Sequence, residues 1–299
     1  MKKYVLPRLR LGSTSFLLHA GYVPAIRFTA ERCDDVALLL LETGPRNEWL
    51  ITQEEVHEAA RILDGEGATL HVHLPVDAHF DTPEASRLLT DKVLAAIERT
   101  APLRPHSFVL HMDFPSLRGC ILTGYKVIPS DEQYIRAAEA LRTIGAALPS
   151  PEMLAIENLE SFPASFWDRW LEQAPWSRCL DAGHIWKDKG DPLPVLKDWF
   201  PRIRILHLHG LIPHGQRGLE KCPSSIWRDH KSLCHTPPTD LDAVLHFLWD
   251  REFHGVLNIE VFSSEDFITS HAALLRSWER YCIRTDNPSE TTRSEFLSL

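Results

Sequence analysis

Short hydrophobic runs with the length of β-strands alternate with amphipathic segments along the whole chain. These runs predict strands at residues 9–15, 36–42, 69–74, 107–112, 153–157, 177–181, 202–209 and 256–262. Strands that alternate with helices indicate a parallel sheet. Because eight such units fit a closed barrel better than a doubly wound sheet, we expect an α/β protein with a single (β/α)8 barrel.

Helix-start signals fall between the hydrophobic runs. In a capping box, a Ser or Thr precedes a polar partner by three residues. Four positions have that form: Thr52, Ser130, Thr239 and Ser263. Thr82 and Asp191 each precede a proline, which is favoured at the first helical position. We expect a helix to begin at each of these six positions.

Two connections are longer than the others, residues 113–129 and residues 210–238. Loops of more than about 15 residues are usually functional. The chain ends in a segment rich in Ser, Thr, Glu and Asn. We therefore expect one catalytic barrel domain over residues 1–284 and a flexible tail over residues 285–299.

The overall composition limits the classes of protein to which the chain can belong. Of its 299 residues, 44% are hydrophobic and 24% are charged, which argues against disordered, fibrous and membrane proteins. The 41 acidic and 32 basic residues give a net charge of -9, so we expect no nucleic-acid partner. No apolar run approaches the roughly 20 residues of a membrane-spanning helix, so we expect no membrane partner.

The start of the chain and its cysteines favour a cytoplasmic protein. Pro7 and Arg8 interrupt any apolar stretch after the basic start, and no small-residue cleavage site follows. The six cysteines include no CxxC pair, a pattern typical of reduced thiols. Neither observation bears on the oligomeric state, which stays open.

Histidines and carboxylates end successive hydrophobic runs. In a barrel of this kind, the active site lies at the carboxyl ends of the strands. The residues at these ends that we select as candidate metal ligands are His73, His111, Glu157, Asp181, His184, His207 and Glu260. His71 and His209 share strand faces with His73 and His207 at another depth, so we expect them to support the site or contact substrate.

The chemistry of these residues is that of a metal cluster. Imidazole nitrogens and carboxylate oxygens are the ligands of Zn2+ and similar ions. Four histidines and three carboxylates exceed what one tetrahedral ion can use, so we expect two or three ions with bridging carboxylates. Zn2+ is the expected metal, with Mn2+, Co2+ or Fe2+ as alternatives. Without a metal, burial of so many carboxylates together would be costly.

The order of these residues resembles the xylose isomerase-like superfamily of TIM barrels, which includes endonuclease IV, over roughly residues 10–281. In that superfamily the ligands follow the order His, His, Glu, Asp-x-x-His, His, Asp-x-His and Glu. The resemblance implies the metal ligands His73, His111, Glu157, Asp181, His184, His207, Asp229, His230 and Glu260. One position departs from the pattern. Asp229 is adjacent to His230, and Arg228 stands where the superfamily has its aspartate.

Several short motifs in the same order resemble the cobamide-remodelling phosphodiesterases of the CbiR type. These motifs are Gly12-Ser-Thr-Ser-Phe16 with Val23-Pro24, Cys33-Asp34-Asp35-Val36, His73-Leu74-Pro75, Cys179-Leu-Asp-Ala-Gly-His184, His207-Leu-His-Gly210, Arg228-Asp-His230 and Glu260-Val-Phe262. The resemblance implies hydrolysis of the nucleotide loop of a cobamide, a corrinoid like vitamin B12. The product would be of the cobinamide type, ready to receive a different lower ligand.

The residues agree with this type of reaction. Bound ions would activate a water for attack on phosphorus, and a carboxylate such as Glu157 or Glu260 would steer its proton. We therefore expect Glu157 and Glu260 to be catalytic as well as metal-binding. No serine or cysteine nucleophile is needed, which suits the absence of a GxSxG motif.

Three alternatives stay open. A sugar isomerase or epimerase of the same superfamily would use one or two Mn2+, Mg2+ or Co2+ ions, but His184 and the Arg228-Asp229-His230 motif favour hydrolysis over it. An abasic-site endonuclease would use nearly the same ligands, but the net charge of -9 disfavours a DNA-binding face. A barrel that only binds a corrinoid or a metal is disfavoured because the ligand set is that of a catalytic centre.

Overall fold

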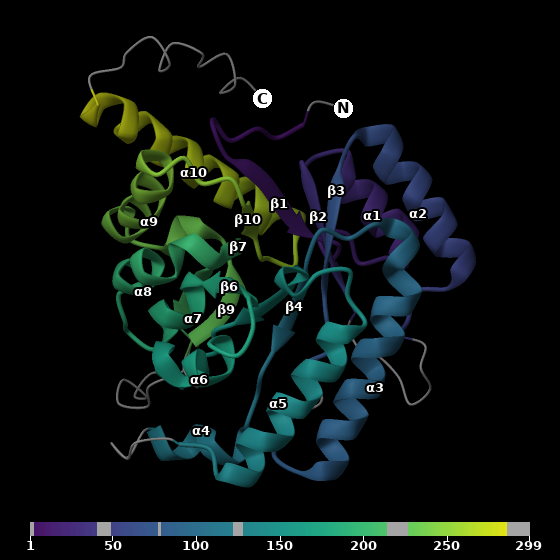
Figure 1. The fold of residues 1–299 in the computed structure, drawn as a ribbon. Coiled ribbons are helices and arrows are strands. Elements are labelled where there is room, and N and C mark those ends of the chain that lie inside the picture. Colours follow the sequence, from purple (N-terminus) through teal and green to yellow (C-terminus); the bar gives the residue numbers. More distant parts are fainter. Residues whose placement is uncertain (1–2, 41–48, 77–78, 122–127, 214–226, 286–299) are drawn as a thin grey trace.

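Eight parallel strands close into a barrel in the computed structural model of the chain, which describes residues 3–40, 49–76, 79–121, 128–213 and 227–285 (Figure 1). Around the barrel, the hydrogen-bonded order is β1, β10, β7, β6, β5, β4, β3 and β2. These strands are β1 (Arg10–Thr14), β2 (Asp35–Leu39), β3 (Thr69–His73), β4 (Phe108–His111), β5 (Leu154–Glu157), β6 (Ser177–Asp181), β7 (Ile203–Leu208) and β10 (Val256–Ile259). The predicted (β/α)8 barrel and its eight strands are confirmed.

Helices follow the strands and cover the outside of the barrel (Figure 1). The α-helices are α1 (Tyr22–Ala30), α2 (Gln53–Glu66), α3 (Pro83–Thr100), α4 (Pro115–Ile121), α5 (Asp131–Ala146), α6 (Asp168–Leu171), α7 (Ala182–Lys187), α8 (Pro192–Trp199), α9 (Pro238–Asp250) and α10 (Ser264–Arg284). Short 3-10 helices are η1 (Ala101–Leu103), η2 (Pro151–Met153), η3 (Ala164–Trp167), η4 (Phe200–Arg202) and η5 (Leu233–His235).

Five of the six predicted helix starts are confirmed. The residues whose side chains accept a backbone hydrogen bond as N-caps are Thr52, Thr82, Ser130, Asp191 and Ser263. The prediction at Thr239 is wrong, because α9 already begins at Pro238. Proline has a helical φ and needs no N–H partner at the first helical position. The helix therefore starts before Thr239 can cap it.

A hairpin lies within the second long connection, where the sequence predicted a loop. β8 (Gly210–Pro213) and β9 (Trp227–Lys231) pair in antiparallel fashion, and residues 214–226 lie outside the described residues. Because β8 follows β7 after a single residue, the hairpin is tied to the carboxyl end of the barrel. The first long connection contains α4, and residues 122–127 within it are also outside the described part.

The last helix, α10, ends at Arg284, and Thr285 follows it as its C-cap. Residues 286–299 of the predicted tail lie outside the described residues, so the tail stays a prediction. Within the described ranges, no helix combines the length and the apolar character that a membrane span requires.

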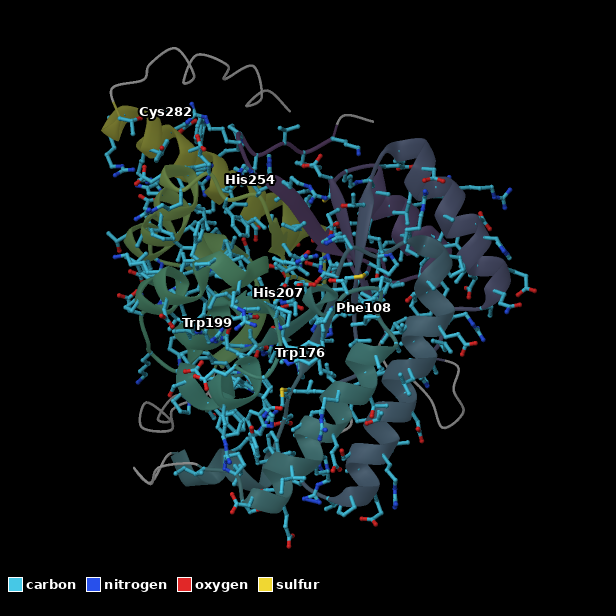
Figure 2. All side chains as sticks on the ribbon, in the orientation of Figure 1. Phe108, Trp176, Trp199, His207, His254 and Cys282 are labelled. Atoms are coloured by element: carbon cyan, nitrogen blue, oxygen red, sulfur yellow. The ribbon has the colours of Figure 1, made fainter. Side chains whose placement is uncertain are left out.

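A small apolar cluster of Val109, Ala155, Cys179 and Ile205 lies inside the barrel on β4, β5, β6 and β7. Alternate residues of a strand face the same side. The residues two positions further along the same strands therefore face the same interior, one level higher: His111, Glu157, Asp181 and His207. Figure 2 places His207 deep among the side chains of the molecule, and its side chain is fully buried. The apolar cluster thus lies one layer below these four ionisable residues.

Replacement of Thr52 by Ala should lower the free energy of unfolding by about 1 kcal/mol, because it removes the side chain that begins the capping box of α2. Thr239→Ala is a matched control, since the exposed Thr239 is not the N-cap of α9 and should change stability by no more than about 0.5 kcal/mol. Urea unfolding measures both variants. Equal losses would contradict the start of α9 at Pro238.

Candidate metal centre

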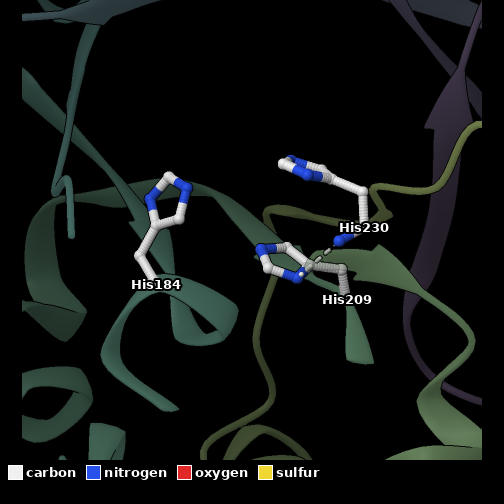
Figure 3. A group of neighbouring side chains, drawn as sticks. All are labelled: His184, His209 and His230. Atoms are coloured by element: carbon white, nitrogen blue, oxygen red, sulfur yellow. Dashed lines mark hydrogen bonds between the residues drawn. The ribbon is translucent and has the colours of Figure 1, made fainter. Parts of the chain in front are cut away.

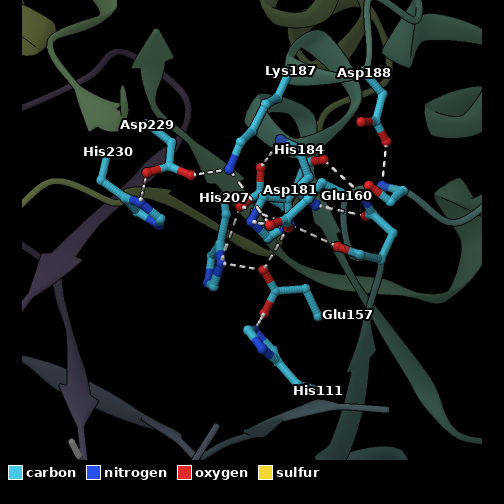
Figure 4. Close-up of polar contacts among 12 residues, drawn as sticks. His111, Glu157, Glu160, Asp181, His184, Lys187, Asp188, His207, Asp229 and His230 are labelled. Carbon is cyan, nitrogen blue, oxygen red and sulfur yellow. Dashed lines mark hydrogen bonds and ion pairs between the residues drawn. The ribbon is translucent and has the colours of Figure 1, made fainter. Parts of the chain in front are cut away.

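Carboxylates and a histidine from the ends of four strands meet inside the mouth of the barrel. Figure 4 shows three of them, Glu157, Asp181 and His207. Glu157 ends β5, Asp181 ends β6, His207 is the fifth residue of β7, and Glu260 directly follows β10. Each of these residues is exposed by 4% or less. Carboxylates buried this deeply need positive partners close by.

His207 lies between three of these carboxylates. Its Nδ1 is 3.0 Å from Oε2 of Glu260, 3.2 Å from Oε1 of Glu157 and 4.0 Å from Oδ2 of Asp181. The strands that carry the acids lie on both sides of β7 in the barrel. Closure of the barrel therefore gathers three acids around one imidazole.

The second oxygen of Glu157 faces another group of histidines. Its Oε2 is 3.0 Å from Nε2 of His111 and 3.4 Å from Nε2 of His73, whereas Oε1 faces His207. A carboxylate with one oxygen in each of two donor groups has the arrangement of a bridging ligand. The structure thus brings the predicted ligands His73 and His111 to the same centre.

The turn after β6 fixes Asp181 and His184. Asp181 is the N-cap of α7, and its Oδ1 accepts the backbone N–H of His184 at 2.8 Å. The side-chain amide of Asn158 binds the N–H and the C=O of Asp181, both at 2.8 Å. Nδ1 of His184 lies 2.9 Å from the carbonyl oxygen of Asn158. If Nδ1 donates to that carbonyl, Nε2 of His184 is left free to bind an ion.

The hairpin supplies His230 from β9. Nε2 of His230 is 3.7 Å from Oε2 of Glu260, and Nδ1 is 3.2 Å from Oδ1 of Asp229. The other oxygen of Asp229 accepts a hydrogen bond from Nζ of Lys187 at 2.5 Å. Asp229 therefore holds the far side of the His230 ring, a common arrangement behind a metal-binding histidine. The ligand role that the resemblance implied for Asp229 stays a prediction.

The spacing of these donors fits divalent ions. Two ligand atoms that lie about 2.0–2.2 Å from one ion are about 3.0–3.5 Å from each other. The contacts of Glu157 with His73, His111 and His207, at 3.0–3.4 Å, fall in that range. In addition, Oδ2 of Asp181 is buried and has no hydrogen-bond donor among the described residues. A buried carboxylate oxygen without a donor favours a cation beside it.

The electrostatics of the centre favour the same conclusion. Burial raises the pKa of Glu157 and of Glu260, but the neighbouring histidines together outweigh burial and hold both pKa values well below their usual range. These histidines are His207 and His111 for Glu157, and His207 and His230 for Glu260. Burial lowers the pKa of His207, but contacts with Cys179, Glu260 and Glu157 raise it well above its usual value. A proton on His207 thus offsets the charge of the two glutamates in the metal-free centre. Bound metal ions would supply that positive charge in place of the proton.

Sequence reasoning missed two groups. Lys187 lies one helical turn beyond His184, but nothing in the sequence pairs it with Asp229 across 42 positions. Asp35 begins β2 at the opposite end of the barrel and contacts the rings of His71 and His106. Burial raises the pKa of Asp35, but the two histidines outweigh burial and lower it. The amino ends of barrel strands serve stability, so we assign this group a structural role.

Residues 26–280 match the family model described as the xylose isomerase-like TIM barrel. The chain belongs to this family. A search of curated proteins found no match. Membership confirms the superfamily that the order of histidines and acids predicted, and members of this family commonly use divalent metals. The narrower resemblance to cobamide phosphodiesterases is not shown by this match and stays a proposal.

Solved structures of xylose isomerase-like proteins are similar to the chain over nearly its whole length. A D-tagatose 3-epimerase-like protein is 17% identical and covers 93% of this chain and 100% of its own, with a TM-score of 0.63. A xylose isomerase domain protein from Planctomyces limnophilus is 12% identical, with coverages of 94% and 99% and a TM-score of 0.66. A D-psicose 3-epimerase is 14% identical, with coverages of 90% and 98% and a TM-score of 0.61. Identities this low establish the fold alone.

Replacement of Glu157 by Gln should weaken divalent-metal binding by about ten-fold or more, because Glu157 serves two groups of donors at once. Elemental analysis after dialysis against limiting metal measures the bound ions per chain. Glu139→Gln is the control, since Glu139 is exposed on α5 and should leave the metal content unchanged. Full metal content in the Glu157→Gln variant would rule out the shared carboxylate.

Proposed function

We propose that the protein is a divalent-metal-dependent hydrolase that cleaves a phosphodiester bond. The observation that carries the proposal is that both glutamates of the centre are shared between groups of histidines. Glu157 lies between His207 and His111, and Glu260 lies between His207 and His230. Such a set is suited to more than one ion with bridging carboxylates, the arrangement that phosphoryl-transfer sites use.

When bound, the ions would supply Lewis-acid activation of the phosphodiester and of the attacking water. The residues of the chain position the centre and handle the proton. Glu157 and Glu260 have pKa values well below their usual range, so both are ionised at neutral pH and can orient the attacking water by accepting its hydrogen bond. Asn158 fixes the backbone that carries Asp181, and Asp229 fixes the ring of His230.

We further propose a cobamide as the substrate, on the strength of the motifs that resemble the cobamide-remodelling phosphodiesterases. Two of these motifs come together at the mouth of the barrel, since the ring of His230 stacks on Phe262 with centroids 4.7 Å apart and an interplanar angle of 17°. The net charge of -9 disfavours a nucleic-acid backbone as the phosphodiester. The proposal therefore includes neither a nucleic-acid nor a membrane partner.

A sugar isomerase or epimerase is the second candidate, and the structural comparisons favour it over the cobamide reaction. The D-tagatose 3-epimerase-like protein and the D-psicose 3-epimerase share the fold over 93% and 90% of this chain. A reaction that moves a proton at a sugar carbon needs two carboxylates at one metal centre. Glu157 and Glu260, on either side of His207, meet that need.

The hairpin histidine separates the two candidates. A sugar reaction at the carboxylate pair has no evident need for His230, whereas a centre with several ions uses it as a further donor. His230 reaches Glu260 because β9 places it there, and Asp229 and Lys187 support its ring from behind. Because two charged residues hold this one histidine in place, we infer that it has a role at the centre, and such a role favours hydrolysis.

Purified protein reconstituted with Zn2+, Mn2+ or Co2+ should convert an adenosylated cobamide to a cobinamide-type product. Parallel incubations with a panel of ketoses and with abasic DNA should show no turnover. Liquid chromatography with mass spectrometry follows all three substrates. Glu260→Gln should lower the cobamide rate by about a hundred-fold or more, because it removes a proton acceptor and a shared ligand.

The His230→Asn variant shows which candidate is correct. Loss of cobamide hydrolysis in this variant supports a centre that uses the hairpin histidine. Turnover of ketoses alone by the unmodified protein would replace hydrolysis by the second candidate, and that turnover should then survive His230→Asn. Thr239→Ala, at the exposed start of α9, should leave every rate unchanged.

A further inference from the structure

His209 lies between β7 and β8 and is completely buried, yet it belongs to no pair of metal donors described above. Figure 3 shows its ring between those of His184 and His230. The rings of His209 and His230 stack with centroids 4.4 Å apart and an interplanar angle of 21°. Nδ1 of His209 also accepts a hydrogen bond from the backbone N–H of His230 at 3.2 Å. One imidazole thus contacts both the ring and the backbone of the hairpin histidine.

The backbone conformation of His230 is one that requires stabilising contacts. Its φ is 52°, in the left-handed region that residues with a side chain rarely adopt. A non-glycine residue stays in this conformation only where its surroundings fix it. The hydrogen bond to His209 and the stacked ring are contacts of that kind, and they turn the His230 side chain toward Glu260.

The proton of His209 can be placed from its neighbours. Nδ1 lies nearer to the N–H of His230, at 3.2 Å, than to the carbonyl oxygen of Gly210, at 3.4 Å. Because an N–H can only donate, Nδ1 accepts, and the neutral ring carries its proton on Nε2. Nε2 lies 3.3 Å from Oδ1 of Asp181. Nε2 has no hydrogen-bond partner among the described residues and lies close to the candidate ligands His184 and His230. In this tautomer Nε2 carries a proton and does not ligate an ion, so His209 acts from beside those two residues.

The turn after β6 is shaped to receive this ring. A Cβ placed on Gly183 would lie 2.2 Å from Cε1, 2.3 Å from Nε2 and 2.5 Å from Nδ1 of His209. These distances are far shorter than any real contact between such atoms. Only glycine therefore fits at position 183 when the imidazole is in place.

We propose that His209 is a positioning residue that locks the β8–β9 hairpin onto the metal centre, with Gly183 as the space in which its ring sits. The ring contacts Asp181 on one side and His230 on the other, so it sets the separation of two candidate ligands from different elements. The inference rests on the metal centre proposed above. It does not depend on which reaction that centre catalyses.

A double-mutant cycle tests the fit of His209 and Gly183. Gly183→Ala should lower the unfolding midpoint by about 3 °C or more in the otherwise unmodified protein, because the new Cβ overlaps the ring. In the His209→Ala background the same change should be neutral or slightly stabilising, since alanine favours the helix more than glycine does. Gly65→Ala, in α2 where a Cβ would contact nothing, should be neutral or stabilising in both backgrounds.

Metal affinity tests the positioning role with a readout that packing alone would not move. Titration of the metal-free protein with Co2+, followed by visible absorbance, should show binding about ten-fold weaker in His209→Leu. His209→Asn should recover most of that loss, because its amide oxygen can replace Nδ1 as the acceptor of the His230 N–H. His271→Leu removes a buried imidazole on α10 that contacts the carbonyl oxygen of Val5, and it should leave Co2+ binding unchanged.

Two results would overturn the inference. The first is an equal cost of Gly183→Ala with and without the His209 ring. The second is Co2+ affinity that is unchanged in His209→Leu, or equally weak in His209→Leu and His209→Asn. Neither measurement uses turnover, so failure of the proposed hydrolysis would leave this inference standing. If His209→Leu does not fold, two measurements still test the inference. They are the double-mutant cycle of Gly183→Ala with His209→Ala and the Co2+ titration of His209→Asn.

Discussion

The centre depends on one arrangement, in which three carboxylates are buried around the single imidazole of His207. Charges removed from water in this way are costly unless partners and hydrogen bonds compensate them. The surrounding structure supplies part of that compensation. Asn158 holds the backbone of Asp181, and histidines from β3 and β4 face the outer oxygen of Glu157. Oδ2 of Asp181 has no hydrogen-bond donor among the described residues. A cation beside that oxygen would complete the compensation.

Membership of the xylose isomerase-like family fixes the scaffold and leaves the chemistry to the site. The three carboxylates around His207 lie at strand ends, and together with His207 they are suited to either a sugar reaction or hydrolysis. The difference arises from donors added around that core. His73 and His111 extend the centre on one side of Glu157, and His230 extends it beyond Glu260. The proposal of phosphodiester hydrolysis thus rests on the number of donors and not on the fold.

The barrel and most of the centre could be predicted from the sequence. Buried parallel strands are short hydrophobic runs, and a histidine or an acid at the end of six of these runs faces the mouth of the barrel. The hairpin could not be predicted in this way, because β9 (Trp227–Lys231) is polar and, among the described residues, pairs with β8 alone. The pairing of Lys187 with Asp229 and the fit of Gly183 to His209 also escaped notice. Both are tertiary contacts between α7 and a distant segment, and no local pattern encodes them.

The position of the hairpin has a consequence for how such enzymes can diverge. The donors on the barrel strands surround His207, whereas His230 lies on β9 of a separate two-stranded sheet that follows β7. Exchange of that sheet would alter the number of ions the centre can hold and the shape of its entrance, with the barrel left intact. A family with this architecture can therefore acquire or lose a reaction class through changes in one surface segment, without rebuilding its core.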